Sequence, residues 1–173
     1  ATPAGEIRNA LRAADRRFAT TGPELAPWVE HYVGIPFAKR GYDRAGLHCW
    51  GLVCLVYSER ARIALPRHED AYDDNLMSSD AKLHELRLLA RAIDGRKSDW
   101  REIAWWEARV LDVLLLPIGD ALCHVALYAG DLHILHVEEG SETCCEDLRL
   151  GRLDARLRRA KLYRHHAIEE MVL

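Results

Sequence analysis

The spacing of apolar residues changes once along the chain, near Trp106, and this change constrains the fold more than any other feature. Before it, apolar residues recur every three or four positions, which is typical of helices. After it, apolar segments are short and are separated by turn-forming residues such as Gly130-Asp131, which is typical of strands. Helices followed by a meander of strands predict an α+β architecture, with N-terminal helices packed on an antiparallel sheet.

The same patterns predict the individual elements. We expect helices over residues 7–18, 28–33, 49–63 and 80–95. A loop with little periodicity is expected over residues 37–46. Strands are expected over residues 110–116, 123–128, 132–137 and 161–167, and the second and third of these form a hairpin.

The composition excludes several functional classes. The 173 residues carry a net charge of −3, which argues against direct nucleic-acid binding. No apolar run is long enough to span a membrane, and the run over residues 113–117 has the length of a strand. Residues 1–10 contain Glu6 and Arg8 and no apolar stretch, so they hold no recognisable export signal, although a chain whose signal had been removed would look the same. The cysteines form no spaced disulfide framework, so we expect synthesis in a reducing cytoplasm.

The cysteines do not follow the spacing of a disulfide framework or of a metal site. There are five of them, so at least one thiol is unpaired or bonded to another chain. The adjacent Cys144 and Cys145 follow His133, but no C-x-x-C pair supports zinc binding. We therefore expect neither a metal nor a cofactor.

Cys49 lies at the predicted start of a helix, directly after His48. Unpaired backbone amides and the helix dipole favour the thiolate there, which is the nucleophilic form of cysteine. A buried structural thiol is an equally good interpretation of this position alone. Cys54, within the apolar run 52–56, is interpreted as a core residue.

Two histidines occupy matching ends of the predicted hairpin. His124 opens one strand and His136 closes the other, so a turn near Gly130 brings them to the same end of the ribbon. A cysteine nucleophile needs a general base, and the base needs a third group to orient it. His124 and His136 fit these two roles, although a single strand histidine is more often structural.

Three segments together resemble the NlpC/P60 family of cysteine peptidases. The sequence Gly-Leu-His-Cys-Trp-Gly-Leu-Val at 46–53 resembles the family's nucleophile motif, commonly G-x-D-C-S/W-G-L-V. Val-Gly-Ile-Pro-Phe at 33–37 is similar to its G-x-P-Y segment, and His-Val-Ala-Leu-Tyr at 124–128 to its H-V-G-I-Y strand. The match spans roughly residues 28–137 in the family's order of Cys, His and polar residue.

This resemblance implies a papain-like α+β fold and hydrolysis of peptidoglycan stem peptides, typically between D-glutamate and diaminopimelate. It also implies a Cys-His-His triad, with Cys49 as nucleophile, His124 as base and His136 as orienting residue. Phe37, His48 and Trp50 are expected near the substrate. His48 replaces the family's usual Asp and Phe37 its usual Tyr, so both positions put activity in question.

The resemblance also predicts a domain organisation. Residues 1–23 form an N-terminal helical extension, and residues 24–140 form the catalytic domain with an insertion over residues 65–107. Residues 141–173 form a basic C-terminal segment that completes the sheet or docks to partners.

The Cys-Trp-Gly-Leu and His-Val-Glu-Glu-Gly sequences most resemble family members encoded with phage tails and gene transfer agents. This likeness implies that tail-tip proteins are partners, within a phage-tail-like particle that opens the wall during DNA delivery. The enzyme would then act in the periplasm of the target cell. An alternative remains open, namely a tail-tip structural or assembly protein that keeps the fold with weak or no catalysis.

Overall fold

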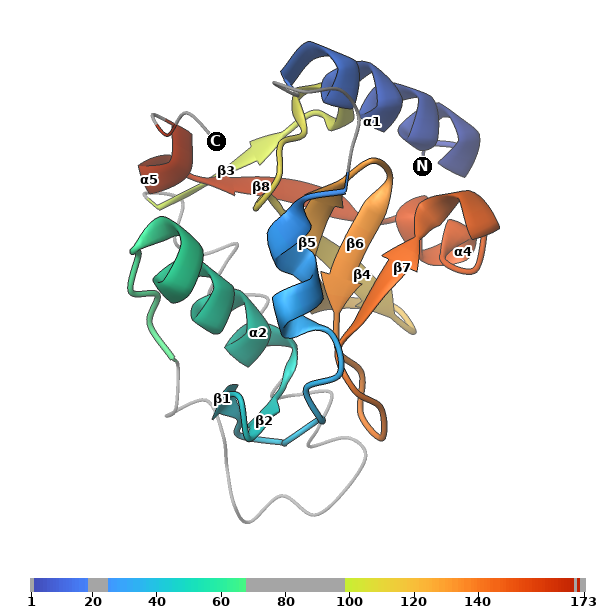
Figure 1. Ribbon diagram of the computed structural model, residues 1–173. Helices are drawn as coiled ribbons and strands as arrows, with labels where there is room; N and C mark the ends of the chain where they lie inside the picture. Colours follow the sequence, from blue (N-terminus) through green and yellow to red (C-terminus); the bar gives the residue numbers. More distant parts are fainter. Residues whose placement is uncertain (1, 19–24, 68–98, 170, 172–173) are drawn as a thin grey trace.

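A six-stranded antiparallel sheet forms the centre of the molecule (Figure 1). The computed structural model describes residues 2–18, 25–67, 99–169 and 171. In spatial order the strands are β3 (Trp100–Ile103), β8 (Lys161–His165), β4 (Val113–Ile118), β5 (Ala121–Gly130), β6 (His133–His136) and β7 (Cys144–Asp147). The predicted α+β architecture and the hairpin of β5 and β6 are confirmed.

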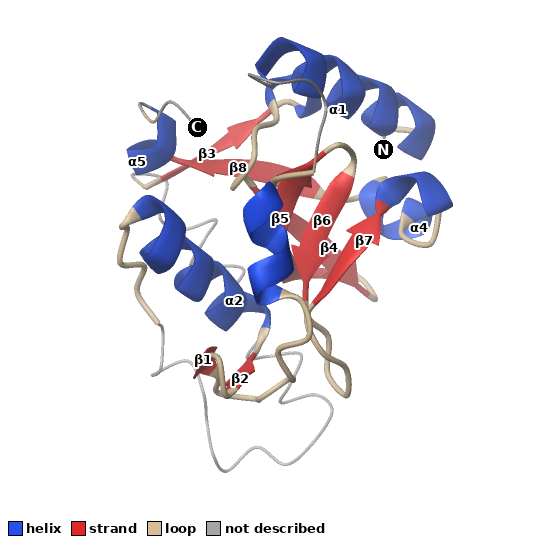
Figure 2. Cartoon of the chain, viewed as in Figure 1, coloured by secondary structure: helices blue, strands red, loops and turns tan. Residues whose placement is uncertain are grey.

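Helices cover both faces of this sheet (Figure 2). On one face lie α2 (Cys49–Val56) and η1 (Pro27–Tyr32), packed on the inward side chains Val113, Leu115, Val125, Leu127 and Leu135. On the other face lie α1 (Ala4–Phe18) and α4 (Asp154–Leu157), packed on Leu114, Leu116, Ala126, Tyr128 and Ile134. The alternation of side chains along each strand thus divides the core into two layers.

The amphipathic helix expected over residues 7–18 is confirmed as α1. Ile7, Leu11 and Ala14 are buried against the sheet. A buried polar contact adds to this packing, since the Tyr128 hydroxyl donates to the Asp15 carboxylate at 2.7 Å. The helix is therefore fixed to β5 by both apolar and polar contacts.

The segment before α2 differs from the expected loop. It contains a small hairpin of β1 (Tyr42–Asp43) and β2 (Gly46–Leu47), which packs beside the start of α2. After α2 the chain continues in wider, π-type turns as η2 (Tyr57–Ala61) and ends at the left-handed residue Arg62. The helix predicted to reach residue 63 therefore stops two residues early.

The C-terminal segment contributes η5 (Leu148–Leu150), α4, β8 and α5 (His166–Glu169) as well as β7. Its strands belong to the central sheet. Several of its basic side chains pair with acids of the same chain, as in Arg149–Asp131, Arg156–Glu138, Lys161–Glu102 and Arg164–Asp112. These pairs involve several of the basic side chains of this segment.

β3 lies at the end of the stretch expected to be an insertion. Trp100 on this strand is buried and packs on Trp50, with ring centroids 6.2 Å apart. The helix expected over residues 80–95 lies outside the described residues. Within the described residues, no helix is both long and apolar enough to span a membrane.

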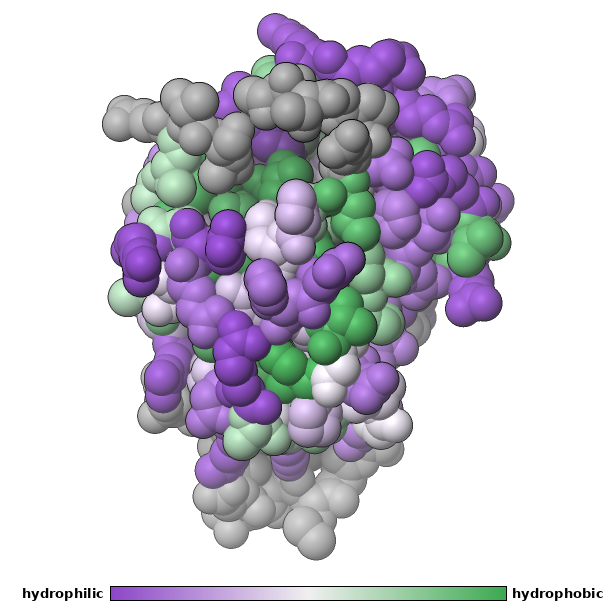
Figure 3. All heavy atoms as spheres, viewed as in Figure 1, coloured by the Kyte–Doolittle hydropathy of each residue, from purple (hydrophilic) through white to green (hydrophobic). Residues whose placement is uncertain are grey.

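The surface is polar at its borders and apolar in one central area. Figure 3 shows hydrophobic atoms gathered in the middle of the viewed face, where η1 crosses it in Figure 1.

The segment before η1 is attached to β5, because the Ala26 backbone N–H donates to the Ala129 carbonyl at 3.0 Å. Val33, which ends η1, is 46% exposed.

Candidate active site

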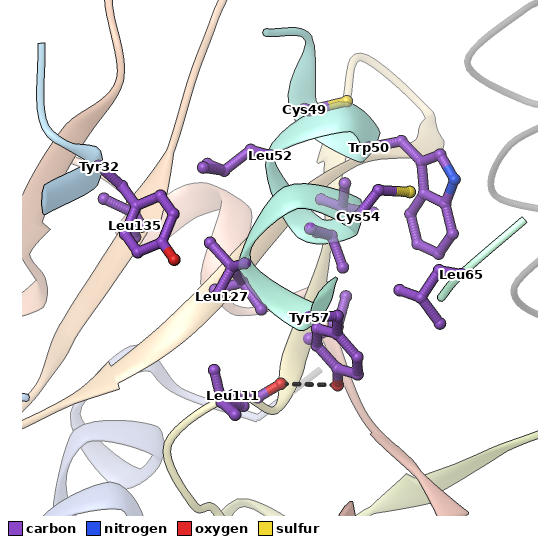
Figure 4. Close-up of a cluster of buried hydrophobic side chains, with 14 of the residues drawn as sticks. Tyr32, Cys49, Trp50, Leu52, Cys54, Tyr57, Leu65, Leu111, Leu127 and Leu135 are labelled. Carbon is purple, nitrogen blue, oxygen red and sulfur yellow. Dashed lines mark hydrogen bonds between the residues drawn. The ribbon is translucent and has the colours of Figure 1, made fainter. Parts of the chain in front are cut away.

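Cys49 is the first residue of α2, the most apolar of the described helices (Figure 4). The following residues Leu52, Val53 and Val56 are fully buried, so the helix is held firmly against the sheet. Tyr57 extends this anchoring beyond α2, because its hydroxyl donates to the Leu111 carbonyl at 2.9 Å. The position of the Cys49 thiol is therefore set by a helix that is packed along its length.

His48 caps this helix. Its Nδ1 accepts a hydrogen bond from the Gly51 backbone N–H at 3.4 Å, and its ring meets the Tyr42 ring edge-on at a centroid distance of 4.8 Å. Burial lowers the pKa of His48 to about 4, which keeps the ring neutral and its Nδ1 able to accept. The residue that departs from the family's Asp thus performs the capping function of that carboxylate.

Gly51 is required by the close approach of the hairpin loop to α2. A Cβ atom at this position would lie 1.9 Å from the Gly41 carbonyl oxygen. The same carbonyl accepts from the His48 backbone N–H at 3.3 Å. The glycine of the Cys-Trp-Gly sequence therefore allows the loop to fix the residue before the thiol.

The electrostatics of the Cys49 thiol differ from the sequence-based expectation. Burial raises its pKa, and the backbone N–H groups of Val125 and Trp50 act in the opposite direction. The backbone groups at the helix start favour the thiolate as expected, but burial is the larger effect and the net shift of the pKa is upward. The ligand-free protein therefore holds Cys49 as a thiol that needs a base.

His124 on β5 and His136 at the end of β6 are in direct contact. His124 Nε2 and His136 Nδ1 lie 3.1 Å apart, and both side chains are buried. β5 and β6 are paired only as far as Leu127 and Leu135, so the strands separate where the two histidines lie. The hairpin prediction for this pair is confirmed.

Cys49 lies on the α2 side of the sheet, near the part of β5 that is not paired with β6. By strand alternation His124 shares the opposite face with Ala126, and it pairs across the strands with Leu116. The thiol lies against the backbone N–H of Val125, the residue that follows His124. The Cys49 thiol therefore contacts the backbone of the residue next to His124, while the two side chains are not hydrogen-bonded to each other.

Charged side chains surround the histidine pair. His136 Nε2 lies 3.2 Å from a carboxylate oxygen of Glu146 on β7. Glu138 lies 3.8 Å from His124 Nε2 and forms an ion pair with Arg156 of α4. Sequence reasoning missed Glu146, although the Gly140 turn after His136 could have indicated a further strand returning beside β6.

Burial and these charges set the protonation of the pair. Burial, His136 and Arg156 hold the pKa of His124 well below its usual value. Burial also lowers the pKa of His136, against the opposing charges of Glu138 and Glu146. Both imidazoles are therefore neutral near pH 7, as a general base requires.

His124, His136 and Glu138 also place possible metal-ligand atoms within 4.8 Å of one another. The ring centroids of the histidines lie 5.3 Å apart, so the facing nitrogens lie nearly on the line between the rings. The lone pairs of His124 Nε2 and His136 Nδ1 therefore point at each other and do not point together at a site where a metal ion could bind. The arrangement fits a hydrogen bond better than a shared metal ion.

The other residues expected near the substrate are placed differently. Trp50 is 1% exposed, and its indole N–H donates to the Pro66 carbonyl at 2.9 Å, so its side chain is part of the core. Phe37 is half-buried, and its backbone N–H donates to the Ser141 carbonyl at 2.9 Å. Phe37 thus joins the loop before α2 to the loop between β6 and β7.

Three comparisons with known proteins bear on the family of the chain. No curated protein matches the chain. The chain is similar to the crystal structure of the NlpC/p60 domain of peptidoglycan hydrolase SagA, with 16% identity and a TM-score of 0.48, over 70% of this chain and 85% of that one. The NlpC/P60 family model matches residues 34–161, a span that contains Cys49, both histidines and five of the six strands of the sheet in full. With its helix-start cysteine and its paired histidines inside that span, the chain belongs to the NlpC/P60 family and has that family's papain-like fold.

Proposed function

We propose that the protein is a cysteine endopeptidase that cleaves peptidoglycan stem peptides. Membership of a family of cysteine peptidases supports this assignment. The observation that carries it is the Cys49 thiol at the start of α2, in contact with the backbone of Val125, which follows His124 in the hydrogen-bonded pair of His124 and His136. Cys49 is the nucleophile, His124 the general base and His136 the residue that orients it.

The reaction follows from these roles. The Cys49 S–H proton moves to His124 as the sulfur bonds to the substrate carbonyl carbon. His124 then gives this proton to the leaving nitrogen as the C–N bond breaks. Water cleaves the resulting thioester, which releases the acid and restores the thiol. Backbone N–H groups at the start of α2 stabilise the oxyanion, and each such donor contributes about 3 kcal/mol in other enzymes.

His124 and the thiol must approach each other for the first proton transfer. Catalytic hydrogen bonds are often formed only in the substrate complex. We propose that substrate binding brings these two side chains together.

Digestion of purified peptidoglycan tests the proposal. The wild-type protein should release stem-peptide fragments that mass spectrometry identifies, and Cys49→Ala should release none. Cys144→Ala is the matched control, because Cys144 is an exposed thiol outside the proposed triad. Fragment release by Cys49→Ala at the wild-type rate would overturn the assignment.

The same digestion identifies the bond. We propose cleavage between D-glutamate and diaminopimelate, which is supported by the likeness of residues 46–53 to the family's nucleophile motif. The fragment masses then show a new diaminopimelate amino terminus. Cleavage elsewhere in the stem would keep the peptidase assignment and replace this specificity.

We also propose delivery by a phage-tail-like particle, with tail-tip proteins as partners. The support is the likeness of the Cys-Trp-Gly-Leu and His-Val-Glu-Glu-Gly sequences to tail-associated members. Immunoelectron microscopy of purified particles should place the protein at the tail tip. Particles without the protein would contradict this role.

A structural tail-tip protein with weak or no catalysis is the second candidate. Replacement of the family's Tyr by Phe37, which lacks a hydroxyl, favours it. Iodoacetamide kinetics separate the candidates. Cys49 rests as a thiol, so in an active enzyme His124 should accept its proton and alkylation should be faster in the wild type than in His124→Ala. Equal alkylation rates in the two proteins at every pH would favour the structural protein.

A further inference from the structure

The histidine pair contacts a third group, the Glu146 carboxylate on β7. β6 and β7 are paired in register, with Ile134 opposite Glu146 and His136 opposite Cys144. Glu146 and His136 therefore lie on the same face of neighbouring strands. The Glu146 side chain is 16% exposed, so its contact with His136 is partly shielded from water.

The hydrogen bonds from Glu146 to His136 and from His136 to His124 determine which ring nitrogen of each histidine carries the hydrogen. A carboxylate only accepts hydrogen bonds, so the hydrogen of neutral His136 must be on Nε2, 3.2 Å from Glu146. His136 Nδ1 then has a lone pair and accepts from His124 Nε2–H at 3.1 Å. With its hydrogen on Nε2, neutral His124 has a free lone pair on Nδ1.

Building on the proposed function, we propose that Glu146 is a positioning residue that fixes the tautomers of both histidines and so leaves His124 Nδ1 free to take the Cys49 proton. Glu146 acts through His136 and does not touch the substrate. In the opposite tautomer, His124 would carry its hydrogen on Nδ1 and could not serve as base at that atom. The carboxylate thus determines which nitrogen of His124 can react.

The other groups around the pair do not select the tautomer. Glu138 lies 3.8 Å from His124 Nε2, beyond hydrogen-bond distance, and pairs with Arg156. The Arg156 charge lowers the pKa of both histidines, and the Glu138 charge raises the pKa of His136. The hydrogen bond of His136 Nε2 is made with Glu146. Glu138→Gln therefore removes a nearby charge, whereas Glu146→Ala removes the acceptor.

Histidine nitrogen NMR on the full chain tests the proposal directly. In the wild type, both His124 and His136 should carry hydrogen on Nε2 at pH 7. Glu146→Ala should give a mixture of tautomers at both residues, while Glu138→Gln should keep the wild-type pattern. Glu146→Gln retains an acceptor oxygen of nearly the same shape, so it should recover the wild-type pattern at least in part.

Kinetics on peptidoglycan fragments give the second measurement. Glu146→Ala should lower kcat about 10- to 100-fold with little change in KM, as is common for groups that orient a functional histidine. Glu142→Gln, an exposed acid on the same hairpin, should leave kcat unchanged. Thermal unfolding of each variant checks that the fold is intact.

The two proposals can fail separately. Unchanged tautomers and unchanged kcat in a folded Glu146→Ala protein would overturn the role of Glu146 while the peptidase assignment stands. A tautomer change in a protein that cleaves no stem peptide would keep the role of Glu146 and overturn the peptidase assignment.

Discussion

His48 Nδ1 accepts the backbone N–H of Gly51 and caps the helix whose first residue is Cys49. An imidazole can do this only while Nδ1 is unprotonated. His48→Ala should therefore lower the free energy of unfolding by about 1 kcal/mol, the usual value of a helix cap, with further loss from its buried ring. His48→Asn retains a capping oxygen and should lose less. Urea unfolding at pH 7 measures both, and equal losses would contradict the capping role.

The lowered pKa of His48 also predicts a pH dependence of stability. The folded protein binds this proton near pH 4, whereas the unfolded chain binds it near pH 6.5. Stability should therefore fall as the pH is lowered from about 6.5 towards 4, with no further loss from this group below pH 4. The contribution is at most about 3 kcal/mol. Urea unfolding at pH 7 and pH 5 should show a smaller difference for His48→Asn than for the wild type.

A methyl group at Gly51 should disrupt the packing of α2 against the segment around Gly41. Gly51→Ala places a Cβ against the Gly41 carbonyl oxygen, and both atoms belong to packed backbone. We expect a loss of several kcal/mol, in the range of severe packing changes. Gly5→Ala is the control, because no atom lies within 4 Å of its added Cβ in α1, and it should stabilise by about 0.5–1 kcal/mol. Thermal unfolding that ranks the two variants in the reverse order would contradict the packing described.

The contact between Asp15 and Tyr128 should be measurable as the attachment of α1. Tyr128→Phe leaves the Asp15 carboxylate, which is 8% exposed, without its hydroxyl donor. We expect a loss of about 1.5–3 kcal/mol in the free energy of unfolding. In an Asp15→Leu background the same substitution should cost less, because no carboxylate remains to be left unpaired. Equal costs in both backgrounds would show that the hydrogen bond contributes nothing.

Local sequence signals were enough for part of the fold and of the site. The β5–β6 hairpin was predicted because its turn residues lie next to its strands, and this placed His124 beside His136. The capping role of His48 was missed, since a histidine is not a usual capping residue. Its use here depends on burial, which the sequence alone does not show.

Other features depend on pairing between distant parts of the chain. On β3, Trp100 pairs with His165 of β8, 65 residues later in the chain, and no local pattern indicates this register. The contact of Glu146 with His136 depends in the same way on the register of β6 and β7. The burial that raises the pKa of Cys49 arises only when α2 meets the sheet, so the helix-start rule alone gave the wrong direction.

The position of β8 between β3 and β4 has a consequence for synthesis on the ribosome. Among the described strands β3 pairs with β8 alone, so in this sheet it has no partner until residues 161–165 have left the exit tunnel. Cys49, His124 and His136 emerge before that point. A nascent chain would thus expose every group of the proposed triad before the six-stranded sheet could be completed.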